Sequence, residues 1–366
     1  MAGPYETRSR SLARLGISND PHSLFMIHGI IKQQPPVITR FQGAPYMNSL
    51  APRPRASTGA AFAAMLTLML AACTGAPGIT GGSQTGGTGP SAPGALRVVA
   101  TTTVLADLVQ QVGGERVNVH SLVPRGGEVH TFDPSPADAS KVADAQLLVI
   151  NGLALDDWLG DMAADAGADE VPMVKLAEDL QGVAYLEGDD HEDEAVNPHL
   201  WLNVEYGILY VERLADALAE ADPDEADAYR ANADDYIAEL QELDGWAREQ
   251  MAGIPDANRK VISFHEAFPY FADAYGLEIV GTVVDAPGQD PSAGEVTALI
   301  DTIRDEEAAA IFTEAQFPTS AAERISEETG LAIVGTLYND SVGDPPADTY
   351  IGMMRWNVEQ VVEALR

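Results

Sequence analysis

The sequence has little cysteine and few basic side chains. Cys73 is the only cysteine among 366 residues, so no intramolecular disulfide can form and burial of apolar side chains must hold the fold together. Lys and Arg number 21 against 56 Asp and Glu, which gives a formal net charge of −35. Nucleic acid and anionic lipid would be repelled by such a chain, so neither is expected as a partner.

Long apolar runs are scarce as well, and the one that stands out lies near the start, at residues 60–70. Two arginines precede it and small residues follow it. The run is too short to span a membrane and has the form of a secretory signal, which we place at residues 47–72 of a leader that covers 1–72. Met47 is a better start for that signal than the first residue, so residues 1–46 are expected to be an over-extended start.

The signal ends in "LAAC" at residues 70–73, which resembles the processing box of bacterial lipoproteins. In that box the cysteine becomes the lipidated first residue of the mature protein. We therefore expect an exported protein that Cys73 anchors by lipid to the outer face of the cytoplasmic membrane, or a periplasmic one. The alternative is a plain signal with an incidental cysteine. Residues 73–95 are rich in Gly, Ser, Thr and Pro, which predicts a flexible tether.

The remaining residues alternate between strand and helix patterns. A β-rich run at 97–102 leads into an amphipathic pattern that ends at Gly113 and Gly114. The same order recurs in "QLLVING" before "ALDDWLGDMAADAG", "KVISF" before "HEAFPYFADAYG" and "AAAIFT" before "EAQFPTSAAERISEETG". This alternation predicts an α/β fold whose parallel sheets are flanked by helices on both faces.

One segment breaks the alternation, at residues 223–253, where apolar side chains recur every three or four residues. This spacing predicts one rigid helix of roughly 40 Å, longer than most crossover helices. Because it lies near the middle of the mature chain, we interpret it as the link between an N-terminal lobe, 96–222, and a C-terminal lobe, 254–366. An ordinary crossover helix within one large sheet is the alternative.

Three of the five histidines after Cys73 lie at expected strand exits or in loops. His130 is on the turn after "VNVHSLVP", His199 is in the loop "VNPHLWLN", and His265 directly follows "KVISF". Asp340 ends the strand-like run "AIVGTLYND". Ligands of open α/β sheets bind beyond the carboxyl ends of the strands, so a shared site between the lobes is predicted. Any one of these residues alone is more typical of a surface or capping residue.

Three imidazoles and one carboxylate suit Zn²⁺, and also Mn²⁺ or Fe²⁺, whereas ions that prefer thiolate find no ligand. Four protein ligands close a tetrahedral site and leave no open position for a reactive water, so the set predicts binding rather than catalysis. Glu314, at the end of "AAAIFTE", is a further candidate. Its carboxylate could orient a ligand histidine, or it could simply favour the dipole of a following helix.

Several segments resemble the metal-specific solute-binding lipoproteins of bacterial ABC importers, the zinc- and manganese-binding family. They are "GGEVHTFDPSPAD", "NPHLWLN", "ISFHEAFPYFADAYG", "FTEAQF" and "GTLYNDSVGDPPADTYIGMMRWNVEQVVEAL", and the likeness covers about 97–366. It implies two α/β lobes joined by a rigid helix, with the metal held between them and handed to a membrane permease that works with a cytoplasmic ATPase. It also implies that the three histidine ligands are His130, His199 and His265 and that the carboxylate ligand is Asp340. A monomer without enzymatic activity is expected.

Two features bear on the choice of metal. The third ligand of the family is His or Glu in different members, and a histidine at 265 favours Zn²⁺ over Mn²⁺. The acidic run "EGDDHEDE" at 187–194 stands where zinc-specific members often carry a long histidine-rich loop. It is interpreted as a solvated acidic loop, with weak metal capture by His191 as the alternative.

Three other functions stay open. A zinc hydrolase is suggested by the pair His265-Glu266, which opens like H-E-x-x-H, but Pro269 stands where the second histidine must be. The G-x-S-x-G motif of serine hydrolases and the phosphate-binding G-x-x-x-x-G-K-[ST] loop are absent from the sequence. A surface adhesin of the same fold would need exposed apolar patches. A receptor for a larger metal complex, such as a siderophore, would leave the three histidines unexplained.

Overall fold

The computed structural model describes residues 94–188, 196–284 and 286–366. The expected leader, the lipidation residue Cys73, most of the tether and the accessory histidine His191 lie outside the described residues. None of the helices within the described ranges is long and apolar enough to cross a membrane.

The described residues form two separate sheets of four parallel strands each. The strand order is β2-β1-β3-β4 in the first sheet and β6-β5-β7-β8 in the second. The strands are β1 (Leu96–Ala100), β2 (Val117–Ser121), β3 (Leu147–Ile150), β4 (Met173–Lys175), β5 (Lys260–Ser263), β6 (Glu278–Thr282), β7 (Ala310–Glu314) and β8 (Ala332–Leu337). In both sheets the second strand along the chain pairs with one side of the first strand, and the third strand pairs with the other side. Each sheet therefore has a switch point between its two central strands, which are β1 and β3 in the first sheet and β5 and β7 in the second. Open sheets bind ligands beyond the carboxyl ends of the strands at such points.

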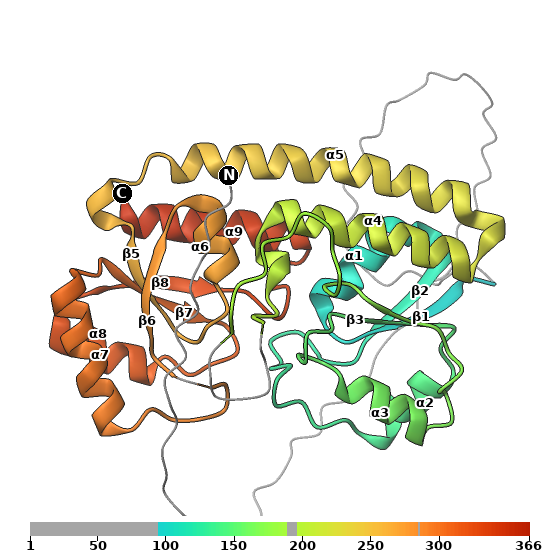
Figure 1. Cartoon of the computed structure of the whole chain (residues 1–366), viewed down its shortest axis with the longest axis horizontal. Helices are drawn as coiled ribbons and strands as arrows, with labels where there is room; N and C mark the ends of the chain where they lie inside the picture. Colours follow the sequence, from blue (N-terminus) through green and yellow to red (C-terminus); the bar gives the residue numbers. More distant parts are fainter. Residues whose placement is uncertain (1–93, 189–195, 285) are drawn as a thin grey trace, which may run out of the picture. The chain divides into compact units, whose positions relative to one another are not determined.

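Helices cover both faces of each sheet (Figure 1). On the first sheet α1 and α4 lie on one face and α2 and α3 on the other, while the second sheet carries α6 and α9 on one face and α7 and α8 on the other. The helices are α1 (Thr103–Gly113), α2 (Pro136–Ala143), α3 (Trp158–Asp165), α4 (Val204–Ala221), α5 (Ala226–Met251), α6 (Pro269–Tyr275), α7 (Ala293–Glu306), α8 (Ser320–Thr329) and α9 (Tyr350–Leu365). These observations confirm the predicted fold class.

The central strands β1, β3, β5 and β7 carry buried apolar side chains on both faces, because helices cover both. In β1, successive residues point to opposite sides, so Val98 and Ala100 enter one core while Val99 enters another. The helix that follows β1 begins where Thr102 accepts a hydrogen bond from the backbone N–H of Leu105. It ends at glycine, as the sequence predicts, because Gly114 adopts a positive φ of 57° that glycine allows without steric cost.

The long central helix is α5, which spans 26 residues and therefore roughly 40 Å. It packs against α1 and α4 from the first half of the chain and against α6 and α9 from the second. A row of apolar side chains along one face of α5 belongs to a hydrophobic core that continues from one half of the chain into the other. Two smaller cores lie on the far faces of the sheets, under α2 and α3 and under α7 and α8. The shared core means that α5 is packed against both halves along its length.

Some helices begin later than the sequence pattern predicts. The segment predicted to be helical after β3 starts as a loop, in which Leu153 and Ala154 have positive φ values of 54° and 65°, and α3 begins only at Trp158. The carboxylate of Asp156 holds this loop by accepting hydrogen bonds from the backbone N–H groups of Asn151 and Gly152, at 2.7 and 2.8 Å. These local bonds compete with helix formation.

The other helices differ at their first turns. After β7, α8 begins at Ser320, because Pro318 disfavours helical backbone at the residue before it. The start of the predicted linking helix, Pro223–Glu225, is a short 3₁₀ turn that leads into α5.

Candidate metal centre

His130 lies in the loop between β2 and α2, as predicted for a residue beyond a strand end. Its backbone N–H donates a hydrogen bond of 2.9 Å to Oε1 of Glu128, which folds the loop back on itself. The backbone N–H of Gly126 donates to the Ser341 hydroxyl at 3.0 Å, so the loop is also tied to the second half of the chain.

His199 lies immediately before the 3₁₀ turn Leu200–Leu202 and is 2% exposed. Its ring Nδ1 lies 3.1 Å from the side-chain oxygen of Asn197, and the Asn197 amide donates to the backbone carbonyl of Glu266 at 2.7 Å. Because the amide nitrogen of Asn197 faces a carbonyl, its oxygen must face the imidazole, so Nδ1 of His199 carries the proton. The lone pair of the His199 ring is therefore on Nε2, which faces Nε2 of His130.

His265 follows β5 after a single residue, Phe264, and is 2% exposed. Its Nδ1 lies 2.6 Å from Oε2 of Glu314, the last residue of β7, although the ring N–H is bent away from a straight hydrogen bond. The strands β5 and β7 are neighbours, so their carboxyl ends bring the two side chains together at the switch point of the second sheet. The carboxylate keeps the proton on Nδ1, and Nε2 of His265 is buried with no hydrogen-bond partner.

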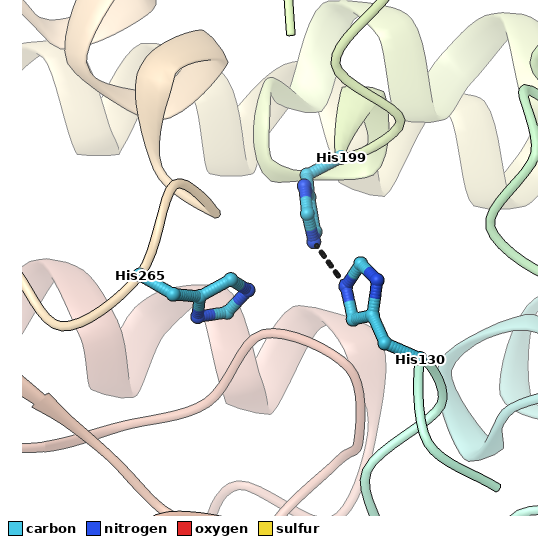
Figure 2. A group of neighbouring side chains, drawn as sticks. All are labelled: His130, His199 and His265. Atoms are coloured by element: carbon cyan, nitrogen blue, oxygen red, sulfur yellow. Dashed lines mark hydrogen bonds between the residues drawn. The ribbon is translucent and has the colours of Figure 1, made fainter. Parts of the chain in front are cut away.

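The three imidazoles converge on one point (Figure 2). One ring nitrogen from each of His130, His199 and His265 lies within 4.8 Å of the other two. The Nε2 atoms of His130 and His199 are 3.4 Å apart. Two ligands of a tetrahedral Zn²⁺ ion, each about 2.0–2.1 Å from the metal, lie about 3.4 Å apart, so this spacing fits a shared ion.

Asp340 lies three residues beyond the end of β8, in a loop rather than in the strand, and is 1% exposed. Its Oδ1 lies 3.7 Å from Nε2 of His199. Its Oδ2 accepts a hydrogen bond of 3.2 Å from the amide of Gln316, whereas Oδ1 is buried without a hydrogen-bond partner. One oxygen is thus held by the protein and the other is free for a cation.

Glu314 does not act on a helix dipole, since it ends a strand and α8 starts only at Ser320. It accepts hydrogen bonds from the backbone N–H of His265 at 3.2 Å and from the Asn339 amide at 3.1 Å. These contacts place it against His265, in a position from which a carboxylate can orient an imidazole.

Sequence reasoning missed several residues of the site. Glu128 has a carboxylate oxygen that lies within 4.8 Å of donor atoms of both His130 and Asp340. Gln316 and Asn339 connect Glu314 to Asp340 through a hydrogen bond of 2.6 Å between their side chains. Glu128 could have been noticed as a carboxylate two residues before a candidate ligand on the same turn, but the amides carry no sequence signal of their own.

The histidines differ in their ionisation. Burial, together with the charge on His265, lowers the pKa of His130 to about 3, and the same causes lower the pKa of His199. Burial also opposes the charged form of His265, but the carboxylate of Glu314, with those of Asp340 and Glu128, outweighs it and raises the pKa of His265 to about 9. Two of the three imidazoles are thus neutral at pH 7, the form in which they bind metals.

The carboxylates are crowded. Burial raises the pKa of Asp340 well above its usual range, and the nearby charge of Glu128 raises it further. Burial likewise raises the pKa of Glu128. Carboxylates that are buried near one another need a cation or a proton between them, so the electrostatics of the site favour a bound divalent ion.

The geometry does not fit the hydrolase pattern. His265 and Glu266 lie before α6, which starts at Pro269, so they are not on one face of a helix with a second histidine. The site instead collects one residue from each of several loops. In His199, His265 and Asp340 a second polar atom of the side chain contacts another protein group.

Comparison with known proteins identifies relatives over most of the described chain. Residues 98–364 match the family described as ZnuA, the periplasmic component A of a zinc-uptake complex. The manganese-binding lipoprotein MntA of Halalkalibacterium halodurans is 33% identical over 286 residues, which are 78% of this chain and 93% of that protein. The iron ABC transporter substrate-binding lipoprotein MtsA of Streptococcus pyogenes is 29% identical over 74% of this chain and 89% of its own length. The solved structure of the periplasmic zinc-binding protein TroA of Treponema pallidum is similar with a TM-score of 0.68 and 25% identity, over 74% of this chain and 99% of that one.

Proposed function

The chain belongs to the family of periplasmic zinc-uptake components, as its resemblance predicted, and on this premise we propose that it is the extracytoplasmic receptor that captures a divalent metal ion for an ABC importer. Relatives are named as substrate-binding lipoproteins of metal ABC transporters and not as enzymes. The receptor would pass its ion to a membrane permease driven by a cytoplasmic ATPase.

One observation carries the proposal. Nitrogen atoms of His130, His199 and His265, which come from three loops far apart in the sequence, lie within 4.8 Å of one another. Asn197 and Glu314 hold the Nδ1 atoms of His199 and His265, so that the Nε2 atoms of these rings are the ones left to bind an ion. Gathering these three imidazoles without an ion would be costly, because Nε2 of the buried His265 has no hydrogen-bond partner and the Nε2 atoms of His130 and His199 have only each other.

The ligands would be the three histidines and Asp340, and the metal would be captured by exchange of its water shell for these four groups. Because three of the donors are nitrogen, we propose Zn²⁺ as the preferred ion, with Mn²⁺ or Fe²⁺ as further cargo. Relatives named for manganese, iron and zinc lie within the same fold, which fits a donor set that is not restricted to one metal.

The proposal includes the attachment and the division of the chain. Cys73 would carry the lipid anchor after removal of the leader, and residues 73–95 would hold the receptor away from the membrane. Residues 96–222 and 254–366 would be the two lobes, joined by residues 223–253. The continuous core along α5 supports small rather than large movements of one lobe against the other on release of the ion.

Equilibrium dialysis of purified, metal-free protein against Zn²⁺ tests the function. The variants His130→Ala, His199→Ala and His265→Ala should each lose most of the affinity, whereas His120→Ala, in β2 outside the site, should bind like the wild type. Zn²⁺ should also raise the melting temperature of the wild type, since a ligand that binds only the folded state stabilises it. Normal binding by all three site variants would refute the assignment.

A further inference from the structure

Glu128 is the one carboxylate at the site that the proposed four-ligand set leaves without a role. Its Oε1 accepts the hydrogen bond from the backbone N–H of His130, and its Oε2 is buried without a hydrogen-bond partner. One carboxylate oxygen of Glu128 lies within 4.8 Å of donor atoms of His130 and Asp340.

The second unpartnered oxygen beside it is Oδ1 of Asp340, whose residue is 1% exposed. Glu128 and Asp340 thus each have one oxygen without a hydrogen-bond partner, and the two carboxylates come within 4.8 Å of each other beside the imidazole of His130. Burial of an unpaired carboxylate oxygen costs free energy, because the oxygen gives up water and receives nothing in exchange. A cation that touched both oxygens would offset that cost at once.

We propose that Glu128 supplies an oxygen ligand, in addition to the three histidines and Asp340, when the bound ion is Mn²⁺ or Fe²⁺, and that it thereby sets which ions the site accepts. The inference rests on the proposed function and deepens it. Zn²⁺ is satisfied by four ligands in a tetrahedron, whereas Mn²⁺ is a harder ion that favours carboxylate oxygen and more than four ligands. Glu128 would therefore contribute little to the affinity for Zn²⁺ and much to the affinity for Mn²⁺.

A purely structural role for Glu128 makes a different prediction. If its only role were to hold the turn through the backbone N–H of His130, then loss of Glu128 would displace His130 and weaken the binding of both ions equally. The substitution Glu128→Gln separates the two roles, because the glutamine side chain keeps a carbonyl oxygen that accepts the same hydrogen bond but removes the carboxylate charge.

The test measures the affinities of metal-free wild type, Glu128→Gln and the exposed control Glu170→Gln for Mn²⁺ and for Zn²⁺ separately. Glu128→Gln should weaken Mn²⁺ binding by about tenfold or more and change Zn²⁺ binding by less than about threefold, because outer contacts alone already alter metal affinity by 10–100-fold. Unchanged Mn²⁺ affinity, or equal losses for both ions, would overturn the inference.

A spectroscopic measurement gives a readout that does not depend on affinity. X-ray absorption spectra of Mn²⁺ bound to the wild type should show more than four nitrogen and oxygen neighbours, and spectra of Mn²⁺ bound to Glu128→Gln should show one neighbour fewer. Identical Mn²⁺ spectra in both proteins would overturn the inference even if Glu128→Gln were poorly stable. If the histidine variants lose binding while Glu128→Gln behaves as wild type with both ions, only the role of Glu128 fails. If the histidine variants bind normally, the proposed function itself fails.

Discussion

Nδ1 of His265 lies 2.6 Å from Oε2 of Glu314, across the ends of the neighbouring strands β5 and β7. The carboxylate is buried and also accepts from the backbone N–H of His265, so it holds both the ring and its loop. A carboxylate behind a ligand histidine fixes the tautomer and makes the opposite nitrogen a stronger donor. The relationship is built by the sheet, because adjacent parallel strands end at the same edge.

Glu314→Gln should therefore weaken metal binding without removing a ligand. We expect a loss of about 10–100-fold in affinity for Zn²⁺, the range typical of outer contacts to metal-bound histidines. Competition titration with a chelator of known affinity measures it, and Glu327→Gln, on an exposed turn of α8, is the matched control. Equal affinities for wild type and Glu314→Gln would show that this contact does not tune His265.

Asp340→Asn should separate binding from stability. The variant should lose at least about a hundredfold in metal affinity, more than an outer contact costs, because a charged ligand is removed. Burial raises the pKa of Asp340, so the charged group destabilises the metal-free fold and the neutral amide should raise its melting temperature. Thermal unfolding with and without Zn²⁺ checks both effects.

The control for this prediction is Asp344→Asn, at a nearby side chain that is 91% exposed. It should change neither the affinity nor the melting temperature of the metal-free protein. A lower melting temperature for metal-free Asp340→Asn would contradict the reasoning from burial.

Gly207 should not tolerate a side chain. A Cβ at this buried position of α4 would meet the hydroxyl of Tyr350, at the start of α9. That hydroxyl donates a hydrogen bond of 2.6 Å to the backbone carbonyl of Trp201, so it cannot move aside freely. Gly207→Ala should lower the free energy of unfolding by about 1–3 kcal/mol, as overpacked cores do.

Gly245→Ala is the matched control for Gly207→Ala, because a Cβ there would meet nothing within 4 Å on the exposed face of α5. It should raise the free energy of unfolding by about 0.5–1 kcal/mol, since alanine is the better helix former. Urea denaturation measures both variants, and equal effects of the same sign would contradict the prediction.

Asp156 should give stability a pH dependence of known sign. Burial raises its pKa to about 6, whereas the ordinary value is 3.8. Between these two pH values the folded protein holds a proton on Asp156 that the unfolded chain releases. The contribution of this protonated carboxyl to the free energy of unfolding is therefore complete below about pH 4 and is lost as the pH rises through about 6. Asp156→Asn cannot titrate, so its free energy of unfolding should improve relative to wild type between pH 4 and pH 7, by up to about 3 kcal/mol.

The measurement for Asp156→Asn is urea denaturation at several pH values, in which only the difference from wild type is interpreted. Asp169→Asn, at an exposed position of the same half, is the control, because it removes a charge that is already in water. A difference that stays constant, or that moves against the variant as the pH rises, would contradict the burial of a charged Asp156.

Much of the fold could be predicted because it depends on local patterns. The apolar spacing of α5 and the alternation of strand and helix need only the sequence and the periods of the two structures. The late start of α3 could not be predicted, since it depends on Asp156 holding the backbone of Asn151 and Gly152. That arrangement is a competition between hydrogen bonds, which the apolar pattern does not record.

Some residues of the candidate site could likewise be predicted from the sequence, and others could not. His130, His199, His265 and Asp340 could be selected because each follows a predicted strand or lies in a loop, and the structure brings the three imidazoles together. Glu128, Gln316 and Asn339 could not, because a single acid or amide in a loop has no periodic pattern.

The sequence by itself determined the order of the elements and the place of the histidines at strand exits or in loops, since both follow from local spacing and composition. Only the tertiary structure decided that Glu314 stands behind His265, that one oxygen of Asp340 is held while the other is free, and that Glu128 reaches the same side of the site. The physical reason is that the distance between two side chains on different strands is set by how the sheets and α5 pack, which no stretch of neighbouring residues encodes alone.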